Sequence, residues 1–484
     1  MVMDADHGTG RPDVTVSARP VAGPAAEPRL PGGVHVDPAG QIAFLQRHYL
    51  GAEQGFVREG GAKLKLVIGG TGAGKTHLLT TLLALARAEG FLAVHVDAGT
   101  QPLWGFDHLY RAVVVDLDLA ALARLFGARL LAHLGYHDAT LAPGETLAAW
   151  SAAGGHDLGR LRVRLDEALH AALVDNPDID YGYALGLERW CAAVLWGGWG
   201  GEARAGAGTE PARPEAGTAA GEAAVALDAT VVVARPAPAI GGGPDPAAEG
   251  GLLEHWLRGG KVAVRDCNRL RVRRSVERFT GRLWLRSLLY FIRLAGLPGL
   301  VVAVDGMGVV LAKRRQKGEA SAAPAAGTWG DFVQGSGDRL HYTRLRLDDL
   351  YESLRTIVDD MGLLPGFTLL LAGPPALLTD TRTGIASYEA LRTRLQNEVE
   401  TVEINRFADQ ISLERLWAAD PDAGRTLAER LIASVAPGAD AQARRDAVAA
   451  AKAQWGARDV TVSAVRRSVL AVLAVARGHG TGTA

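Results

Sequence analysis

The stretch GGTGAGKT, residues 69–76, constrains the fold of this chain more than any other feature. It fits the phosphate-binding (Walker A) pattern GxxxxGK[ST] in full, and it stands between an apolar run, Leu64–Ile68, and a helical pattern over Lys75–Glu89. In a strand–loop–helix unit of this kind, backbone amides surround a phosphate group and the helix N-terminus adds a favourable dipole. The pattern therefore predicts an α/β P-loop fold that binds a nucleotide.

Individual side chains of this motif have distinct expected roles. Lys75 would place its charge on the terminal phosphates, and Thr76 would offer its hydroxyl to Mg²⁺. Asp305 ends the apolar run LVVAVD and suits the second magnesium ligand, so Thr76 and Asp305 are the expected metal ligands. The expected nucleotide-binding residues of the loop are Gly69, Gly70, Thr71, Gly72, Ala73, Gly74, Lys75 and Thr76.

Further short apolar runs predict the rest of a sheet. They alternate with helical patterns, which is typical of a parallel sheet covered on both faces. The strands expected besides Leu64–Ile68 are Phe91–Ala98, Leu300–Gly306, Phe367–Gly373 and Val399–Ile404. One helix is expected across residues 36–60 and another after Asp348, which we expect to act as its N-cap.

Composition divides the 484 residues into more than one unit, and a hydrophobic share of 48% allows a sizeable core. The first residues lack periodicity, and a later stretch rich in Ala, Gly and Pro has little to bury. The expected parts are a disordered tail (1–33), the P-loop half of the core (34–110), a helical insertion (111–200), a low-complexity linker (201–250), the second half of the core (251–411) and a C-terminal helical lid (412–484).

Cysteine usage and hydropathy exclude several classes of protein. Cys191 and Cys267 form no CxxC pair, so neither a disulfide framework nor a zinc site is expected. The N-terminus lacks the apolar core of a signal peptide. The most apolar window, 288–306, is interrupted by Arg293 and Pro298 and does not resemble a membrane span. We therefore expect a cytoplasmic protein without membrane contact.

Two positions lack groups that ATP hydrolysis commonly uses. Gly306 follows Asp305 where the additional-strand class of P-loop ATPases usually has a water-polarising Glu. Pro374 and Pro375 follow a strand that usually ends in a polar sensor, and proline donates no hydrogen bond. Such losses affect turnover more than ground-state binding. The sequence identifies no catalytic residue and leaves hydrolysis open, because another acid such as Glu389 could approach the site.

Several segments together resemble the ATP-binding protein of BREX phage-defence systems, the BrxD-like group: LKLVIGGTGAGKT, AVHVDAGTQPL, RLAGLPGLVVAVD, FTLLLAGPPALLTDTRTGIASYEALRTRL and VSAVRRSVLAVL. The resemblance covers roughly residues 35–115 and 252–475. It implies an ATP-binding, AAA+-like protein that acts in antiviral defence, either with other defence subunits or as a homo-oligomer. The family usually has Glu where Gly306 stands and AGTP where this chain has AGPP.

The same resemblance implies nucleotide contacts for three arginines. Arg394 matches a position that could contact a neighbouring subunit, and Arg466 or Arg467 matches the basic position of the lid. A guanidinium suits these places because it stabilises a transferring phosphoryl group. The alternative for each arginine is a solvated helix face.

Two basic segments, Arg258–Arg286 and Lys313–Lys317, stand out in a chain whose net charge is −1. Clustered arginine and lysine attract phosphate backbones, so these segments suggest contact with DNA; the alternative is a solvated helix face and an exposed loop. Three functions follow from the sequence: an ATP-binding defence component, a non-hydrolysing scaffold or regulatory subunit, and a nucleotide-controlled DNA-binding module.

Overall fold

The computed structural model describes residues 36–137, 146–197, 246–312, 340, 342–395, 404–435, 438 and 440–455. Several expected features lie outside these residues: the tail 1–33, most of the linker 201–250, the basic run Lys313–Lys317, most of the expected strand Val399–Ile404, and both Arg466 and Arg467. The described residues belong to two units, and each is considered by itself.

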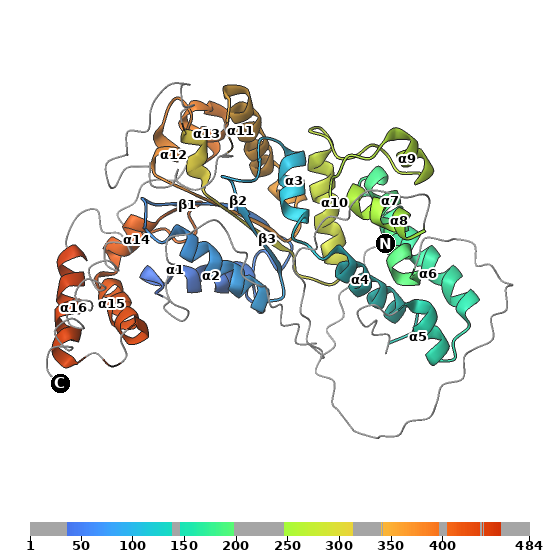
Figure 1. The fold of residues 1–484 in the computed structure, drawn as a ribbon, viewed down its shortest axis with the longest axis horizontal. Coiled ribbons are helices and arrows are strands. Elements are labelled where there is room, and N and C mark those ends of the chain that lie inside the picture. Colours follow the sequence, from blue (N-terminus) through green and yellow to red (C-terminus); the bar gives the residue numbers. More distant parts are fainter. Residues whose placement is uncertain are drawn as a thin grey trace, which may run out of the picture. The chain divides into compact units, whose positions relative to one another are not determined.

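A five-stranded parallel sheet forms the centre of the larger unit (Figure 1). This unit contains the described residues within Pro20–Asp116, Val276–Arg293 and Leu297–Ala484. The strands are β1 (Ala62–Ile68), β2 (Leu92–Asp97), β3 (Leu300–Asp305), β4 (Phe367–Gly373) and β5 (Gln410–Ser412), in the order β2-β3-β4-β1-β5. The parallel α/β core and its first four strands are therefore confirmed.

The sequence did not predict the fifth strand that the structure describes. β5 pairs with the last residues of β1, and Leu66 N also donates to Asp409 O at 2.7 Å. Only Ile411 of this short strand is apolar and buried, so no hydrophobic run marks it. Backbone hydrogen bonds position this edge strand, and no hydrophobic pattern in the sequence predicts it.

Helices cover both faces of the sheet (Figure 1). On one face, α1 (Gln41–Leu45) and α2 (Lys75–Ala88) share a buried apolar cluster with Ala303 and Ala372. On the other face, Leu109 and Leu354 line a small apolar cavity with Val304. They belong to α3 (Phe106–Val114) and α11 (Arg344–Asp359). The other helices of this unit are α10 (Gly281–Leu294), α12 (Ala376–Thr379), α13 (Glu389–Leu395), α14 (Leu413–Ala419), α15 (Pro421–Val435) and α16 (Ala441–Trp455).

Two local predictions in this unit are wrong. The N-cap of α11 is Thr343, whose hydroxyl accepts a hydrogen bond from Arg346 N, whereas Asp348 lies inside the helix. The helix begins a turn earlier than expected because Leu347 already belongs to its buried face. The expected single helix across 36–60 is a 3₁₀ turn, α1 and a π-helical turn, because Ala39 has a φ of 56°.

The smaller unit is helical in its described residues, which fall within Leu117–Ser275 and Leu294–Gly296. Its helices are α4 (Leu119–His133), α5 (Leu147–Ala153), α6 (Leu158–Leu173), α7 (Tyr181–Trp196), α8 (Pro246–Leu257) and α9 (Val264–Arg269). The described residues of the expected insertion form mainly helices.

Both cysteines lie in the smaller unit, where they are buried and free, in agreement with the absence of a disulfide pattern. The N-caps of α4, α5, α6 and α7 are Asp118, Thr146, Asp157 and Asp180, and each side chain accepts a backbone amide hydrogen bond. Within the described parts of the chain, no helix has the length and apolar character needed to span a bilayer.

Candidate functional site

Residues Gly69–Thr76, named the glycine loop below, connect β1 to α2 at the carboxyl end of the sheet. Gly72 and Gly74 have φ values of 76° and 102°, in the left-handed region that only glycine adopts without strain. Gly74 immediately precedes α2, so the loop places successive backbone amides at a helix N-terminus. This backbone geometry is what an anion-binding loop requires.

The two polar side chains that end the glycine loop have defined partners. Lys75 Nζ donates to the carbonyl oxygens of Gly69 and Gly70, both at 2.7 Å. Thr76 Oγ1 donates to Asp305 Oδ2 at 2.5 Å, and Asp305 Oδ1 accepts from Gly306 N at 2.7 Å. The structure therefore brings Thr76 and Asp305 together across 229 positions of sequence.

A hydroxyl beside a carboxylate is a donor set that suits Mg²⁺, which takes oxygen ligands. In the described part of the chain, no group of three or more His, Cys, Asp or Glu residues could form a metal site of its own. Mg²⁺ is commonly held by one or two protein oxygens together with substrate phosphates, so Thr76 and Asp305 fit that mode of binding.

The helix α14 contacts the glycine loop at three points that the sequence did not predict. Glu414 Oε1 accepts from Gly70 N at 2.5 Å, and Trp417 Nε1 donates to Ala73 O at 3.1 Å. The side chain of Leu413 lies so close to Gly69 that a Cβ there would be 3.2 Å from Leu413 Cδ1. No local pattern reveals these contacts, because Gly70 and Glu414 are 344 positions apart.

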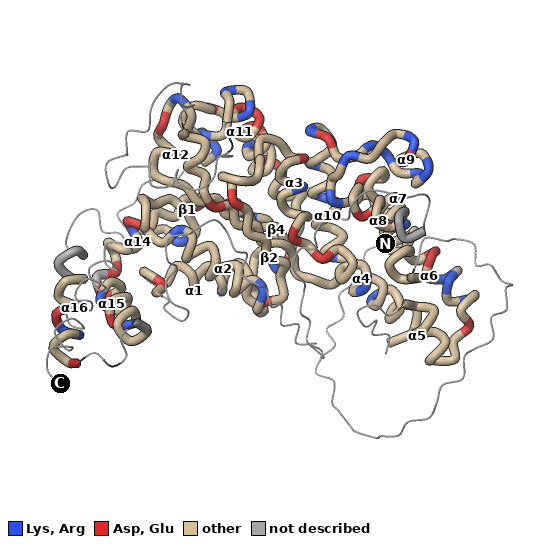
Figure 2. The backbone as a smooth tube through the Cα atoms, in the orientation of Figure 1, with Lys and Arg blue, Asp and Glu red and all other residues tan. Residues whose placement is uncertain are grey.

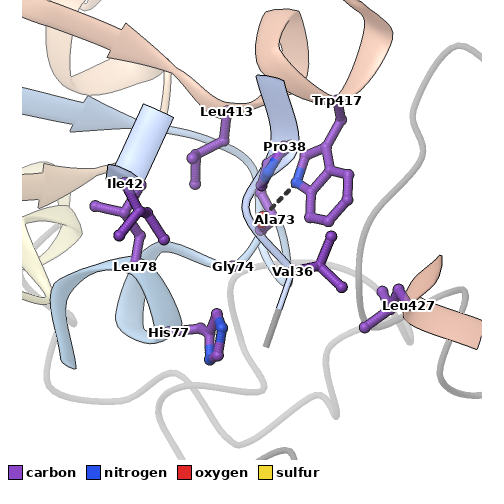
Figure 3. Close-up of a pocket in the computed structure, with 10 residues that line it drawn as sticks. All are labelled: Val36, Pro38, Ile42, Ala73, Gly74, His77, Leu78, Leu413, Trp417 and Leu427. Atoms are coloured by element: carbon purple, nitrogen blue, oxygen red, sulfur yellow. Dashed lines mark hydrogen bonds between the residues drawn. The ribbon is translucent and has the colours of Figure 1, made fainter. Parts of the chain in front are cut away.

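An apolar pocket opens beside the glycine loop (Figure 3). Three separate segments meet there: the residues at the start of the described chain, the loop with the first turn of α2, and the helices α14 and α15. The lining residues are Val36, Pro38, Ile42, Ala73, Gly74, His77, Leu78, Leu413, Trp417 and Leu427. The mostly apolar walls suit the flat ring system of a ligand. Phosphates on the same ligand could then reach the glycine loop.

Comparison with known proteins gives one family. A family model described as BREX system ATP-binding protein BrxC/D matches residues 46–124 and 339–461. The chain is similar to BrxC/D proteins over these two stretches. Neither the curated proteins nor the solved structures gave a match. The first matched stretch contains the glycine loop, and the second contains α14 and α15. Residues of both stretches therefore line the pocket. The strand β3 lies between the two stretches in sequence.

The structure shows the surroundings of Pro374 and Gly306, the two positions without a polar side chain for hydrolysis. Pro374 is buried directly after β4, and its carbonyl accepts from Leu377 N at 2.9 Å to start α12. Gly306 has a φ of 74° and begins the 3₁₀ turn Met307–Leu311. The Glu389 side chain is 65% exposed and pairs with Arg392 of its own helix at 2.5 Å.

Another acid lies at the same end of the sheet. Asp97 is the last residue of β2 and stands in register with Asp305. Its Oδ1 accepts from Gly99 N at 2.8 Å, and its Oδ2 accepts from Thr100 Oγ1 at 3.2 Å. Sequence reasoning missed Asp97, although the run FLAVHVD ends in an acid just as LVVAVD does.

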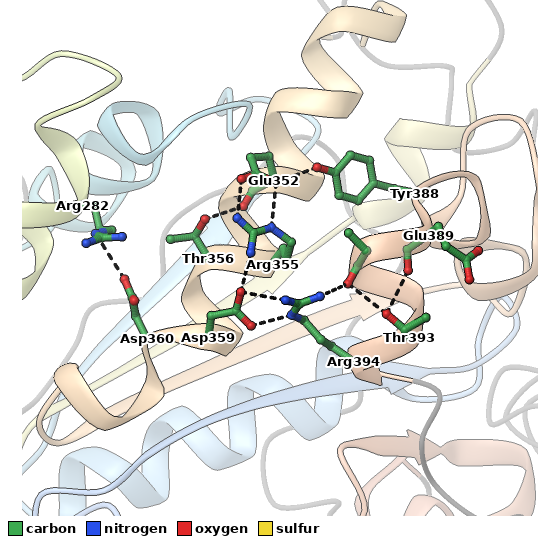
Figure 4. Close-up of polar contacts among 11 residues, drawn as sticks. Arg282, Glu352, Arg355, Thr356, Asp359, Asp360, Tyr388, Glu389, Thr393 and Arg394 are labelled. Atoms are coloured by element: carbon green, nitrogen blue, oxygen red, sulfur yellow. Dashed lines mark hydrogen bonds and ion pairs between the residues drawn. The ribbon is translucent and has the colours of Figure 1, made fainter.

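Arg394, for which the family resemblance implied a nucleotide contact, binds an acid of its own unit (Figure 4). Its Nε and Nη2 donate to Asp359 Oδ1 and Oδ2 at 2.5 and 3.0 Å, and its Nη1 donates to Ala390 O at 2.6 Å. The hydrogen bond from Arg394 lowers the pKa of the Asp359 carboxyl. Arg355 binds Asp359 as well, which makes the arrangement a network between α11 and α13.

The basic segment Arg258–Arg286 is divided between the two units. The part in the larger unit contains Arg278 and Arg282, which form ion pairs with Asp349 and Asp360. The part in the smaller unit has exposed basic residues around α9 (Figure 2): Lys261, Arg265, Arg269, Arg271, Arg273 and Arg274. The segment is therefore not one continuous surface of free charge.

Proposed function

We propose that the protein binds ATP at the glycine loop and serves as an ATP-binding component of a BREX-type antiviral defence system. The observation that carries the proposal is the Thr76–Asp305 pair at the end of the glycine loop, next to the apolar pocket. The family match to BREX system ATP-binding proteins supports it.

In this proposal each part of the site has a role in binding. The loop amides and the N-terminus of α2 hold the phosphates, and Lys75 moves from the carbonyls of Gly69 and Gly70 to the terminal phosphates. The adenine enters the apolar pocket, against the indole of Trp417. Thr76 and Asp305 would hold Mg²⁺, which neutralises phosphate charge when it is bound.

We further propose that the core is AAA+-like. The sheet order supports this, because β4 lies between β1, which carries the glycine loop, and β3, which ends in Asp305. Helices α14, α15 and α16 then act as a lid whose position depends on the nucleotide, since α14 already contacts the loop through Glu414 and Trp417. Other defence subunits, or further copies of this chain, would respond to that lid.

The test is ATP affinity measured by calorimetry for the full chain and for Lys75→Ala. We expect the variant to bind at least about tenfold more weakly, because it loses a charge-assisted contact of about 1.5–3 kcal/mol. Lys63→Ala is the matched control, since Lys63 lies in β1 and pairs with Asp409. Equal affinity of wild type and Lys75→Ala would refute the proposal.

A competing function is a scaffold or regulatory subunit that holds ATP without hydrolysing it. Gly306 and Pro374 favour this function, since neither offers a side-chain group to a water or a terminal phosphate. Steady-state turnover of the purified chain, measured beside its ATP affinity, separates the two. Affinity without turnover supports the scaffold, and turnover that Lys75→Ala abolishes supports the ATPase.

A DNA-binding module controlled by nucleotide is a second candidate, favoured by the exposed basic residues around α9. Within 261–274 the opposing acid is Asp266, which is partly buried and pairs with Arg265 and Arg269. Phosphate contacts release counterions, so the affinity for duplex DNA should fall steeply as salt rises. Unchanged DNA binding after reversal of Lys261, Arg271 and Arg274 to Glu would refute this candidate.

A further inference from the structure

Asp97 lies beside the position that lacks the expected acid. β2 and β3 are parallel and in register over their whole length, so Asp97 and Asp305 end adjacent strands side by side. Ala98 N donates to Asp305 O at 2.9 Å, which continues the pairing past the last residues. Because Asp305 also binds Thr76 of the glycine loop, all three side chains belong to the carboxyl end of one sheet.

The side chain of Asp97 occupies the space that a residue at position 306 would need. A Cβ built on Gly306 would lie 3.0 Å from Asp97 Oδ1, which is tighter than ordinary van der Waals contact. The φ of 74° at Gly306 also strains any residue other than glycine. The carboxylate of Asp97, at the end of the neighbouring strand, therefore requires a glycine after Asp305. Gly306→Glu would displace the Asp97 carboxylate rather than supply a missing one.

The carboxylate of Asp97 is held but not saturated. Gly99 N and Thr100 Oγ1 each donate one hydrogen bond to it, at 2.8 and 3.2 Å. An ionised carboxylate has about four acceptor positions, so a water can be bound in addition. A partly buried carboxylate that accepts from two donors keeps one orientation. A group that positions a water needs such a fixed orientation.

We propose that Asp97 is the general base for ATP hydrolysis in this chain, an assignment that rests on ATP binding at the glycine loop. Asp97 accepts a hydrogen bond from the attacking water. The water oxygen forms a bond to the terminal phosphorus, and the bond from that phosphorus to the bridging oxygen breaks. ADP leaves with the electron pair, the water's proton passes to the Asp97 carboxylate and then to solvent, and ATP and water become ADP and phosphate.

The alternative role for Asp97 is to cap the turn through Gly99, which requires an acceptor but no negative charge. Asp97→Asn separates the two roles, because its amide oxygen still accepts from Gly99 N but takes no proton. We expect turnover to fall by about 100-fold or more. ATP affinity by calorimetry should stay within about threefold and the thermal midpoint should be unchanged.

The matched control is Asp380→Asn. Asp380 is also a partly buried turn residue of the larger unit, and its Oδ1 accepts from Arg382 N at 2.7 Å and from Thr383 N at 2.9 Å. This control should leave turnover unchanged. A second readout is the nucleotide recovered from protein incubated with ATP and then desalted: ADP from the wild type, and intact ATP from Asp97→Asn.

Turnover that persists in Asp97→Asn overturns the assignment, and so does a wild type that binds ATP without hydrolysing it. A wild type that binds no ATP instead refutes the proposed function, and the assignment falls with it. If Asp97→Asn does not fold, Asp97→Ser takes its place, because a serine hydroxyl also accepts the amide of a tight turn and provides no base.

Discussion

Two regions of the larger unit bring together charged residues that are far apart in sequence, and they use charge differently. At the glycine loop, Asp305 accepts a hydrogen bond from the hydroxyl of Thr76, and Lys75 Nζ donates to the backbone carbonyls of Gly69 and Gly70. Between α11 and α13, Arg394 and Arg355 both bind the carboxylate of Asp359. These contacts of the first region join a charged group to a neutral one, whereas those of the second region join opposite charges.

This contrast distinguishes a binding site from an ion-pair network when both are rich in charge. A lysine that binds carbonyls gains a stronger partner when a phosphate arrives, and a carboxylate that binds a hydroxyl gains one when Mg²⁺ accompanies the phosphate. Ligand binding is therefore favourable there. A charge in a bidentate ion pair must first break that pair. The glycine loop is also anchored to buried groups through Trp417, while the Arg394–Asp359 pair is about one-third exposed on both sides.

The largest effect is expected where the glycine loop meets the core. Trp417 is 7% exposed and its indole donates to Ala73 O, so Trp417→Ala removes both packing and a hydrogen bond. We expect a loss of about 3–5 kcal/mol in the free energy of unfolding and weaker ATP binding. Urea unfolding and calorimetry measure the two quantities.

Trp417→Phe is the control that sharpens this result. It keeps an aromatic ring against the pocket and removes the N–H donor, so Ala73 O loses a hydrogen-bond partner at a cost of about 1–3 kcal/mol. If Trp417→Ala were as stable as the wild type and bound ATP equally well, the coupling between α14 and the glycine loop would be wrong.

A smaller effect is expected in the network. Because the ion pair of Arg394 and Asp359 is solvent-exposed, with side-chain exposures of 34% and 35%, Arg394→Ala should cost little stability. ATP affinity of the isolated chain should not change. A double-mutant cycle with Asp359→Ala isolates the pair. A tenfold loss of ATP affinity in Arg394→Ala would contradict this expectation and indicate that the arginine contacts the nucleotide.

Much of the core could be predicted from the sequence because its signals are local. Four strands are mostly apolar runs, and the motif around Lys75 specifies both a backbone shape and a charge. Asp305 could be predicted as well, since an acid at the end of a buried strand lies at the carboxyl end of a parallel sheet. The same argument applied to Asp97 would have found it.

What the sequence could not provide depends on pairings without a local pattern. β5 has one buried apolar residue, and its place beside β1 is decided by backbone hydrogen bonds. Glu414 and Trp417 reach the glycine loop only because α14 follows that strand. The partner of Arg394 depended on the packing of α11 against α13, which brings Asp359 within hydrogen-bond distance.

The smallest effect concerns the other acid of the network, Glu352 (Figure 4). Hydrogen bonds from Arg355 and then Tyr388 outweigh burial and lower the pKa of the Glu352 carboxyl from 4.5 to about 2. A carboxyl whose pKa is lower in the folded state stabilises the protein above its unfolded pKa. That contribution is lost as pH falls from about 4.5 toward about 2.

The size of this contribution is limited by solvent, because the Glu352 side chain is 43% exposed, so about 0.2–1 kcal/mol is expected. Glu352→Gln should therefore be less stable than the wild type at about pH 7, with the difference shrinking at about pH 3. Urea unfolding at both values measures it, with Glu389→Gln on the exposed side of α13 as the control. A difference in the free energy of unfolding that grows on acidification would mean that Arg355 and Tyr388 do not stabilise the ionised form of Glu352. The description of this region as a network of paired charges would then be wrong for Glu352.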